Sequence, residues 1–257
     1  MRSVQDFAVK DSLKEGKCVL FVGTPCQVAA LYKYLGDFGS NSLITIDLVC
    51  HGVANSKIFR GYIAFLEKKL NAKIVDYRFR SKKYGWDRQL YELDLSRNGK
   101  IRKGRCFFWG ESVFHANYTK GNILRPSDFN CKYAIGKRVG DFTIGDLWGY
   151  DKTVSFNPNK GISCCLLNTE KAVRILSHLE LNLQEIPVDF IVNGNVCLRH
   201  PSKKGKNYEH CMDYMRNGRY GELDDELRRS IGRRVRLRRL LKVVLPLQCY
   251  GSIKKYI

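Results

Sequence analysis

The fold is decided by two similar stretches, CVLFVGTPCQ at residues 18–27 and LITIDLVCHG at residues 43–52. Each begins with a short apolar run, which is typical of a strand buried in a sheet. Each run ends in a turn that contains a cysteine, Cys26 in the first and Cys50 in the second. Between the two runs, apolar residues recur at helical spacing from 27 to 35. We therefore predict a right-handed strand–helix–strand unit with parallel strands.

The rest of the chain predicts an α/β fold: a mixed sheet with this N-terminal βαβ unit, flanking helices and a basic helical C-terminal tail. Two regions are expected, an α/β domain over residues 1–190 and a tail over 191–257 that is irregular and then helical. Periodicity and turn signals predict helices over 4–15, 56–70, 107–118, 169–181 and from 208 onward, and strands over 73–79, 89–96, 100–104, 142–144 and 163–168.

Positive charge is concentrated at the C-terminus. The 257-residue chain has a net charge of +20, and residues 228–257 contain ten Lys or Arg and no acid. Leu237, Leu240 and Leu241 stand there at helical spacing, with arginines on the opposite face. Such a helix could lie on an anionic membrane surface, or could pack its leucines on the body of the protein. Nucleic-acid binding ranks lowest, because no nucleic-acid-binding module is legible.

Several classes are excluded by the sequence. No stretch approaches 18 consecutive apolar residues, and residues 1–16 lack the apolar core of a signal peptide. We expect a cytoplasmic protein, with its tail able to lie on the inner face of the membrane. The ten cysteines are then not expected to form disulfides. No serine or cysteine triad, glycosidase carboxylate pair, Rossmann fingerprint or P-loop is legible.

The placement of three cysteines indicates a metal site. Parallel strands would bring Cys26 and Cys50 to one edge of the sheet, where open α/β sheets bind ligands. Cys26 also stands at a predicted helix start, which favours the thiolate. Cys131 lies in the loop over residues 124–133. Three thiols from separate turns suit an iron–sulfur cluster. Structural zinc is the rival interpretation, but it generally uses closely spaced cysteine pairs and the sequence has no Cys-x-x-Cys.

Five motifs between about Val4 and Thr169 resemble the coenzyme F-420 hydrogenase/dehydrogenase beta-subunit family and occur in that family's order. They are GTPCQ at 23–27, DLVCHG at 47–52, FRSKKYGW at 79–86, LRPS at 124–127 followed by Cys131, and DFTIGDLWG at 141–149. Each motif alone is a weak signal. Together they identify the chain as similar to the C-terminal domain of this family.

Members of this family resemble FAD enzymes in which a cysteine-bound 4Fe–4S cluster exchanges electrons with the flavin. The resemblance implies that Cys26, Cys50 and Cys131 are cluster ligands. The fourth ligand is usually a cysteine three residues before the last, and this position is Asp128 here. A carboxylate is a harder ligand than a thiolate and holds iron less firmly. The implied site could therefore hold a 4Fe–4S cluster, a 3Fe–4S cluster or none.

Two parts of the usual family pattern have no match in this sequence. One is a ferredoxin-like module with closely spaced cysteines, and the other is a Ser/Gly-rich loop that helps to hold the flavin. The resemblance thus implies an N-terminally truncated relative, whose oxidoreductase-like domain at residues 1–190 needs a ferredoxin-like or flavin-domain partner chain. Bacterial members often accompany surface-polysaccharide genes. The alternative is a degenerate, non-catalytic relative that acts as a membrane-apposed binding partner in polysaccharide biosynthesis.

The third motif offers candidate residues for the flavin. Arg80 and Lys82 stand beside Trp86, and such a cationic, aromatic loop could hold a flavin phosphate or stack on its ring. A solvated connection between two strands is the alternative. Thr24, in the first motif, is a further cofactor-binding candidate.

Three more residues complete the predicted site. Arg138 could bind a phosphate, or could pair with Asp141 or Asp146, and Asp146 is itself a cofactor-binding candidate. His51 follows Cys50 directly and could donate a proton to a reduced flavin or a substrate. It could equally form a hydrogen bond within its own turn.

Overall fold

The computed structural model describes residues 4–39, 41–150 and 153–232, with 235, 237 and 241. The chain divides into two compact units. Unit 1 comprises residues 1–51, 127–156 and 162–202, and unit 2 comprises residues 52–126, 157–161 and 203–257. The division therefore does not fall at the expected boundary of residue 190. Unit 2 is formed mainly by a long insertion between two strands of unit 1 and by the C-terminal helices.

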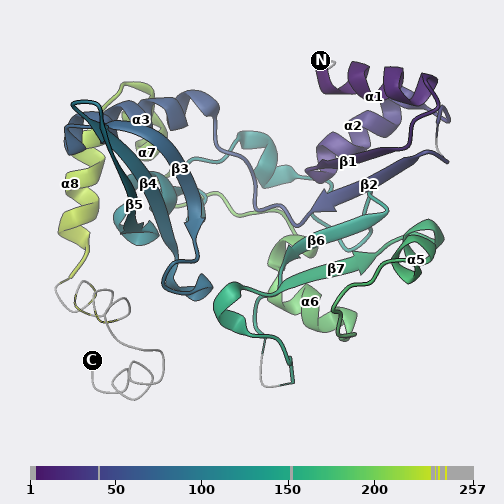
Figure 1. The fold of residues 1–257 in the computed structure, drawn as a ribbon. Helices are drawn as coiled ribbons and strands as arrows, with labels where there is room; N and C mark the ends of the chain where they lie inside the picture. The colour runs from purple at the N-terminus through teal and green to yellow at the C-terminus, as the bar shows by residue number, and fades with distance from the viewer. Residues whose placement is uncertain are drawn as a thin grey trace. The chain divides into compact units, whose positions relative to one another are not determined.

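Unit 1 is built on a four-stranded mixed sheet (Figure 1). Three strands are parallel, in the order β1, β2 and β6, and β7 is antiparallel to β6. This confirms the predicted α/β class and the N-terminal strand–helix–strand unit. The elements are α1 (Val4–Lys14), β1 (Val19–Gly23), α2 (Pro25–Leu35), β2 (Leu43–Leu48), β6 (Phe142–Asp146), β7 (Ser163–Leu167), α5 (Glu170–Ser177) and α6 (Val188–Gly194).

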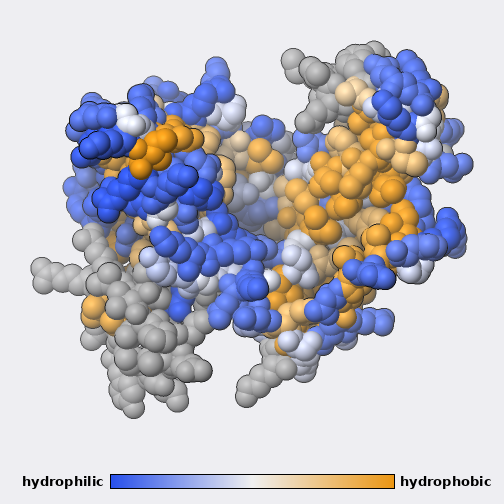
Figure 2. Space-filling view, viewed as in Figure 1, coloured by the Kyte–Doolittle hydropathy of each residue, from blue (hydrophilic) through white to orange (hydrophobic). Residues whose placement is uncertain are grey.

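One face of this sheet is packed and the other is largely open. Phe21 of β1 and Leu43 of β2 are buried against α2, whose Val28 and Leu31 are fully buried. The opposite face carries Leu20 and Val22, which are 59% and 50% exposed, and the exposed Leu167 of β7. Figure 2 shows hydrophobic residues gathered over this sheet. Parallel strands are usually covered on both faces, so an apolar surface of this kind is unusual.

Unit 2 contains a three-stranded antiparallel sheet, in the order β3, β4 and β5 (Figure 1). The buried ring of His115 lies against the rings of Tyr77 and Tyr91, from the sheet, and of its chain neighbour Phe114. The elements are α3 (Ser56–Leu70), β3 (Lys73–Ser81), β4 (Leu90–Arg97), β5 (Lys100–Phe108), α4 (Val113–Thr119), α7 (Tyr208–Arg216) and α8 (Tyr220–Ser230). Short 3-10 turns span Trp86–Arg88, Trp109–Glu111, Pro126–Asn130, Pro158–Lys160 and Val196–Leu198.

Two parts of the predicted secondary structure differ from the fold. The helix expected from residue 107 begins only at Val113, because β5 continues to Phe108 and pairs there with Leu90. The region expected to be irregular after residue 189 contains α6, which buries Ile191.

The predicted amphipathic tail lies almost entirely outside the described residues. The cations from 233 onward lie outside the described residues, whereas Leu237, which is 50% exposed, and Leu241 lie within them. In the part of the chain that is described, no helix has both the length and the apolar composition needed to cross a membrane.

Candidate functional site

The sheet of unit 1 brings Cys26 and Cys50 to equivalent positions. β1 and β2 run parallel in a register that sets Gly23 opposite Asp47. Each cysteine follows its member of this pair at the same distance along the chain, so both lie just beyond the carboxyl ends of neighbouring strands. We call this side of the sheet the carboxyl edge. The side chain of Cys26 is exposed and that of Cys50 is half-buried.

Cys26 is also part of the start of α2. Thr24 precedes the helix, and its hydroxyl lies 3.1 Å from the Cys26 sulfur. The side-chain oxygen of Gln27 accepts hydrogen bonds from the Thr24 backbone N–H at 2.9 Å and from the Thr24 hydroxyl at 3.0 Å. These contacts close the first turn, where backbone N–H groups point outward and stabilise negative charge. The predicted candidate Thr24 thus contacts the thiol and the helix start.

A buried ion pair ties the loop of Cys131 to the end of β2. Asp47 is fully buried, and the Arg138 side chain is 2% exposed. Their closest atoms, Arg138 Nη2 and Asp47 Oδ1, are 2.6 Å apart. The same guanidinium donates to the carbonyl of Leu48 at 3.1 Å and to that of Tyr133 at 3.0 Å. Because Tyr133 is two residues from Cys131 and Leu48 is two residues from Cys50, Arg138 holds the two cysteine-bearing segments together.

Arg138 therefore has a structural role that the sequence did not reveal. Its partner is Asp47, not Asp141 or Asp146 as the sequence suggested. The second oxygen of Asp47 accepts from the backbone N–H groups of Val139 and Gly140 at 3.1 and 2.8 Å. The donors of Arg138 all point at protein acceptors, so this side chain does not fit a flavin phosphate.

Asp141 anchors a second buried network in unit 1. It accepts hydrogen bonds from the backbone and hydroxyl of Thr45, at 2.9 and 3.1 Å, and from the hydroxyl of Thr169 at 3.0 Å. Lys171 Nζ lies 2.9 Å from the carboxylate. Burial alone would raise the pKa of Asp141, but Lys171 and these hydrogen bonds together lower it. The carboxylate is therefore a stable anion that joins β2, β6 and the start of α5.

Cys197 is a cysteine at the same edge that the sequence did not single out. It lies in the short turn Val196–Leu198, and its sulfur is 3.9 Å from Nδ1 of His51 and 3.9 Å from the Ser202 hydroxyl. Burial raises the pKa of the Cys197 thiol, the Ser202 hydroxyl lowers it, and charge repulsion from Cys131 raises it. The two thiols are thus within range of an electrostatic interaction. No spacing in the sequence signals this proximity.

His51 is held by the segment that follows Cys197. Its Nδ1 lies 3.2 Å from the Ser202 hydroxyl, which donates a short hydrogen bond to the His51 carbonyl oxygen. His51 thus forms hydrogen bonds with Ser202, a residue far from its own turn in the chain. Its suggested role as a proton donor stays a prediction.

Asp128, the fourth ligand position predicted from the family pattern, lies three residues before Cys131 in the chain. Asp128 is half-buried within the turn Pro126–Asn130. Across the described ranges, no three His, Cys, Asp or Glu side chains meet closely enough to hold a single metal ion. A 4Fe–4S cluster makes a different demand, because each thiolate binds a different iron and the sulfur ligands stand further apart.

Three further predicted flavin ligands, Arg80, Lys82 and Trp86, lie in unit 2. The Arg80 guanidinium stands over the ring of Trp86 at 5.3 Å and over that of Trp109 at 5.1 Å. Trp86 is only 4% exposed and packs on Gly161, where a side chain would collide with the indole. Its ring is therefore part of the core and is not available to stack on a flavin. Lys82 is exposed. Asp146, in unit 1, accepts a hydrogen bond at its carbonyl from Asn195.

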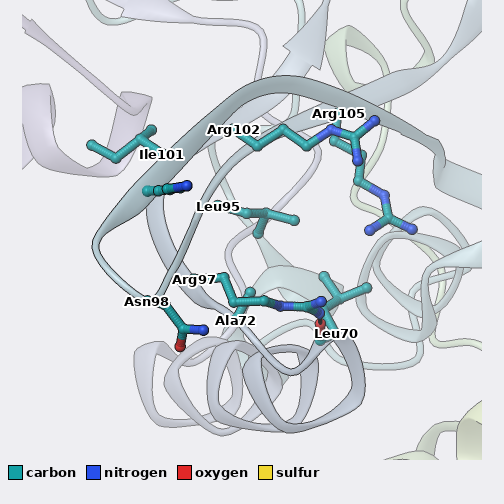
Figure 3. A pocket seen from close by; sticks show the side chains of 9 residues that line it. Leu70, Ala72, Leu95, Arg97, Asn98, Ile101, Arg102 and Arg105 are labelled. Carbon is teal, nitrogen blue, oxygen red and sulfur yellow. Dashed lines mark hydrogen bonds between the residues drawn. The ribbon is translucent and has the colours of Figure 1, made fainter.

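Unit 2 also contains a shallow hollow of about 440 Å³ (Figure 3). Its walls carry several cationic side chains, and none of the predicted site residues lines it. Arg97 donates to the carbonyls of Leu70 and Asn71 at 2.7 and 2.8 Å, so it closes the turn after α3. The lining residues are Leu70, Ala72, Leu95, Arg97, Asn98, Lys100, Ile101, Arg102 and Arg105.

Fold and site together define a class: an α/β domain in which Cys26 and Cys50 follow the carboxyl ends of two parallel strands. Residues 16–187, more than half of the chain, match the family described as the C terminus of the coenzyme F420 hydrogenase/dehydrogenase beta subunit. The chain therefore belongs to this family and is a beta-subunit-like oxidoreductase domain. This confirms the resemblance inferred from the five motifs. Among curated proteins, none matches the chain.

The match contains Cys26, Cys50, Cys131 and Asp128, whereas Cys197 lies beyond its end. Two other cysteines within it, Cys164 and Cys165, lie next to each other in β7. Cys164 is buried, and burial raises the pKa of its thiol to about 11. Cys165 is exposed, because neighbouring residues of a strand point to opposite faces.

Proposed function

We propose that this chain is the electron-transfer component of an oxidoreductase and passes electrons between a 4Fe–4S-type cluster and a flavin. The observation that carries the proposal is the arrangement of Cys26, Cys50 and Cys131 at the carboxyl edge. The first two follow parallel strands in matching register, and Arg138 ties the loop of the third to the same place. Membership of the family supports the redox chemistry.

The thiol set is suited to an iron–sulfur cluster by its chemistry. Thiolates are the usual cluster ligands, and Cys26 stands at a helix start that favours the charged form. When bound, a cluster would supply one-electron transfer. The protein's own contribution is to fix the turns that carry the ligands. The Asp47–Arg138 pair does this without contributing a ligand itself.

The flavin is proposed to be held with the help of a partner chain. Within the described residues, Arg138 and Trp86 are used internally, which leaves Thr24, Lys82 and Asp146 as weaker candidates from the sequence. The exposed apolar face of the unit 1 sheet, with Leu20 and Val22, supports a partner. That partner would be a ferredoxin-like or flavin-domain chain, and FAD would be bound only in the complex.

Anaerobic purification tests the cluster directly. The wild-type protein, reconstituted with iron and sulfide, is expected to be brown and to contain iron and acid-labile sulfide. Cys26→Ser and Cys50→Ser should each lose most of the iron, while Cys165→Ser should retain it. A wild-type protein that stays colourless and iron-free after reconstitution would contradict the proposal.

A second candidate function is that of a non-catalytic binding partner on an anionic membrane, within a polysaccharide pathway. The concentration of ten cations and no acid in residues 228–257 favours it. Each cation near such a surface contributes about 1 kcal/mol. Co-sedimentation with vesicles of anionic and of neutral lipids tests this. Binding to anionic vesicles by an iron-free protein would favour the second function over the first.

A further inference from the structure

We propose that Cys197 is the fourth thiolate of the site at the carboxyl edge, in the position that the family pattern would give to Asp128. This inference rests on the proposed function, because it names a further ligand of the same cluster. Cys197 lies outside the segment that matches the family. Only the fold brings it beside His51, the residue that follows Cys50.

The first support is the position of its sulfur. Cys197 Sγ is 3.9 Å from Nδ1 of His51, the residue that directly follows Cys50. Cys197 therefore lies beside the residue that follows Cys50, and Cys131 is within range of an electrostatic interaction with it.

The second support is the way the segment is anchored. Asn195 is buried, and its side chain donates to the carbonyl of Asp146 at the end of β6. Gly194 lies so close to the Trp148 backbone that no larger residue fits there. Leu198 is 1% exposed within a hydrophobic cluster of unit 1. Residues on both sides of Cys197 are thus fixed against β6 and the turn that follows it.

β6 is the third parallel strand of the sheet, and its carboxyl end lies on the same edge as those of β1 and β2. Cys26 and Cys50 follow the ends of β1 and β2, and Cys197 lies in the turn that Asn195 fixes to the end of β6. The loop held by Arg138 adds Cys131. Four thiols at one sheet edge form a complete cysteine set for a 4Fe–4S cluster.

Ligand chemistry favours Cys197 over Asp128. Thiolate is a soft ligand that suits iron–sulfur clusters, whereas carboxylate suits harder ions. The high pKa that burial gives the free Cys197 thiol does not oppose binding, because a metal deprotonates its thiol ligand. Asp128 can then remain a polar residue of the loop without contacting iron.

Iron content and cluster type in matched variants test the assignment. Wild-type protein, Cys197→Ser, Asp128→Ala and the control Cys165→Ser are reconstituted anaerobically and compared by iron assay and electron paramagnetic resonance. Cys197→Ser should lose about a quarter of the iron or more and show a three-iron signal. Asp128→Ala and Cys165→Ser should match the wild type. The double variant D128C/C197S should regain the four-iron cluster.

A measurement on the unmutated chain guards against misfolding of a variant. Exposed thiols are alkylated before and after cluster loading and identified by mass spectrometry. Cys26, Cys50, Cys131 and Cys197 should become protected on loading, and Cys165 should react equally in both states.

The outcomes separate the two proposals. If the wild type loads a cluster but Cys197 is neither protected nor needed for full iron content, the assignment of Cys197 is overturned and the proposed function stands. If Asp128→Ala loses iron in place of Cys197→Ser, Asp128 is the ligand. If the wild type binds no cluster, both proposals fail.

Discussion

Both units bury charged side chains, among them Arg88, Asp94 and Asp224 in unit 2, but unit 2 also contains a cluster of packed aromatic rings. Unit 1 buries charged groups, above all Asp47 with Arg138 and Asp141 with its ring of donors. Unit 2 buries aromatic rings around His115, including Tyr77 stacked at 6.0 Å and Tyr91 at 4.8 Å between ring centres.

This difference suggests two roles for buried contacts: the ion pair positions the segments of the site, and the aromatic packing stabilises the fold. A buried ion pair adds little net stability, because desolvation offsets the attraction, but it fixes geometry once it is formed. Aromatic packing stabilises through the large apolar area that it removes from water. The Asp47–Arg138 pair stands beside the candidate site, and the aromatic cluster is in the other unit. We therefore regard unit 1 as organised around the site and unit 2 as a scaffold.

The largest effect is expected from breaking the buried ion pair. Asp47→Ala leaves the Arg138 charge buried and unpaired, which should cost about 3–5 kcal/mol of unfolding free energy. Urea denaturation of the apoprotein measures this. The matched control is Asp11→Ala, whose pair with Lys14 is more than half exposed and should cost less than about 1 kcal/mol. Equal losses in the two variants would contradict the role given to Asp47.

A cavity in unit 2 should reduce stability without affecting the site. Leu93, in the central strand β4, is fully buried. Leu93→Ala should cost about 2–5 kcal/mol, from lost apolar contact and from the cavity left behind. Iron content after reconstitution, measured at a temperature where the variant is folded, should stay at the wild-type level. Loss of iron would show that the scaffold and the site are not separable.

The buried histidine of unit 2 should make stability depend on pH. Burial lowers the pKa of His115 to about 3, although the Phe79 backbone opposes the shift. The unfolded chain, with a pKa near 6.5, then takes up a proton that the folded chain does not. Stability is therefore full above about pH 6.5 and is lost as the pH falls towards 3, by about 2 kcal/mol between pH 7 and pH 5.

Urea midpoints at these two pH values test the slope, and His115→Phe should flatten it. Asp141 in unit 1 should make stability depend on pH at lower pH values. Its pKa is depressed, so its contribution is present above its usual value of 3.8 and is lost as the pH falls through its lowered pKa. A slope between pH 7 and pH 5 that His115→Phe leaves unchanged would refute the assignment to His115.

The smallest effect compares two helix starts. Thr24 precedes α2 in unit 1, and Asn55 caps α3 in unit 2 by accepting from the Lys57 backbone at 2.9 Å. Thr24→Ala and Asn55→Ala should each cost about 1 kcal/mol. Only Thr24→Ala should also change the alkylation rate of Cys26, because the Thr24 hydroxyl contacts that sulfur. If Cys26 is alkylated at the same rate in both variants, Thr24 has no role at the site.

Local patterns in the sequence were sufficient for much of the fold. The apolar runs at 18–22 and 43–49 predicted β1 and β2, and parallel strands followed from the helix between them. Periodicity also found α3 and the three strands of unit 2. It missed α6, whose single buried residue, Ile191, leaves little apolar repeat to detect.

Single-residue roles were harder to predict where they depend on distant partners. The sequence correctly predicted that Arg138 could form an ion pair, but it suggested the wrong partners. The actual partner, Asp47, lies 91 positions away in the chain. Trp86 looked like an exposed stacking platform, yet it is buried against Gly161. Burial and pairing of this kind arise from contacts between segments far apart in the chain, which a local pattern does not contain.

The sequence by itself determined the family, the parallel strands and the placement of Cys26 and Cys50 at one edge, because these follow from local periodicity and the handedness of strand connections. Only the tertiary structure decided that Arg138 holds the Cys131 loop in place and that Cys197 lies beside His51. The contacts of Arg138 with Leu48 and of Cys197 with His51 join residues 90 and 146 positions apart. They form only when helices and strands pack into one core, so they are properties of the assembled fold.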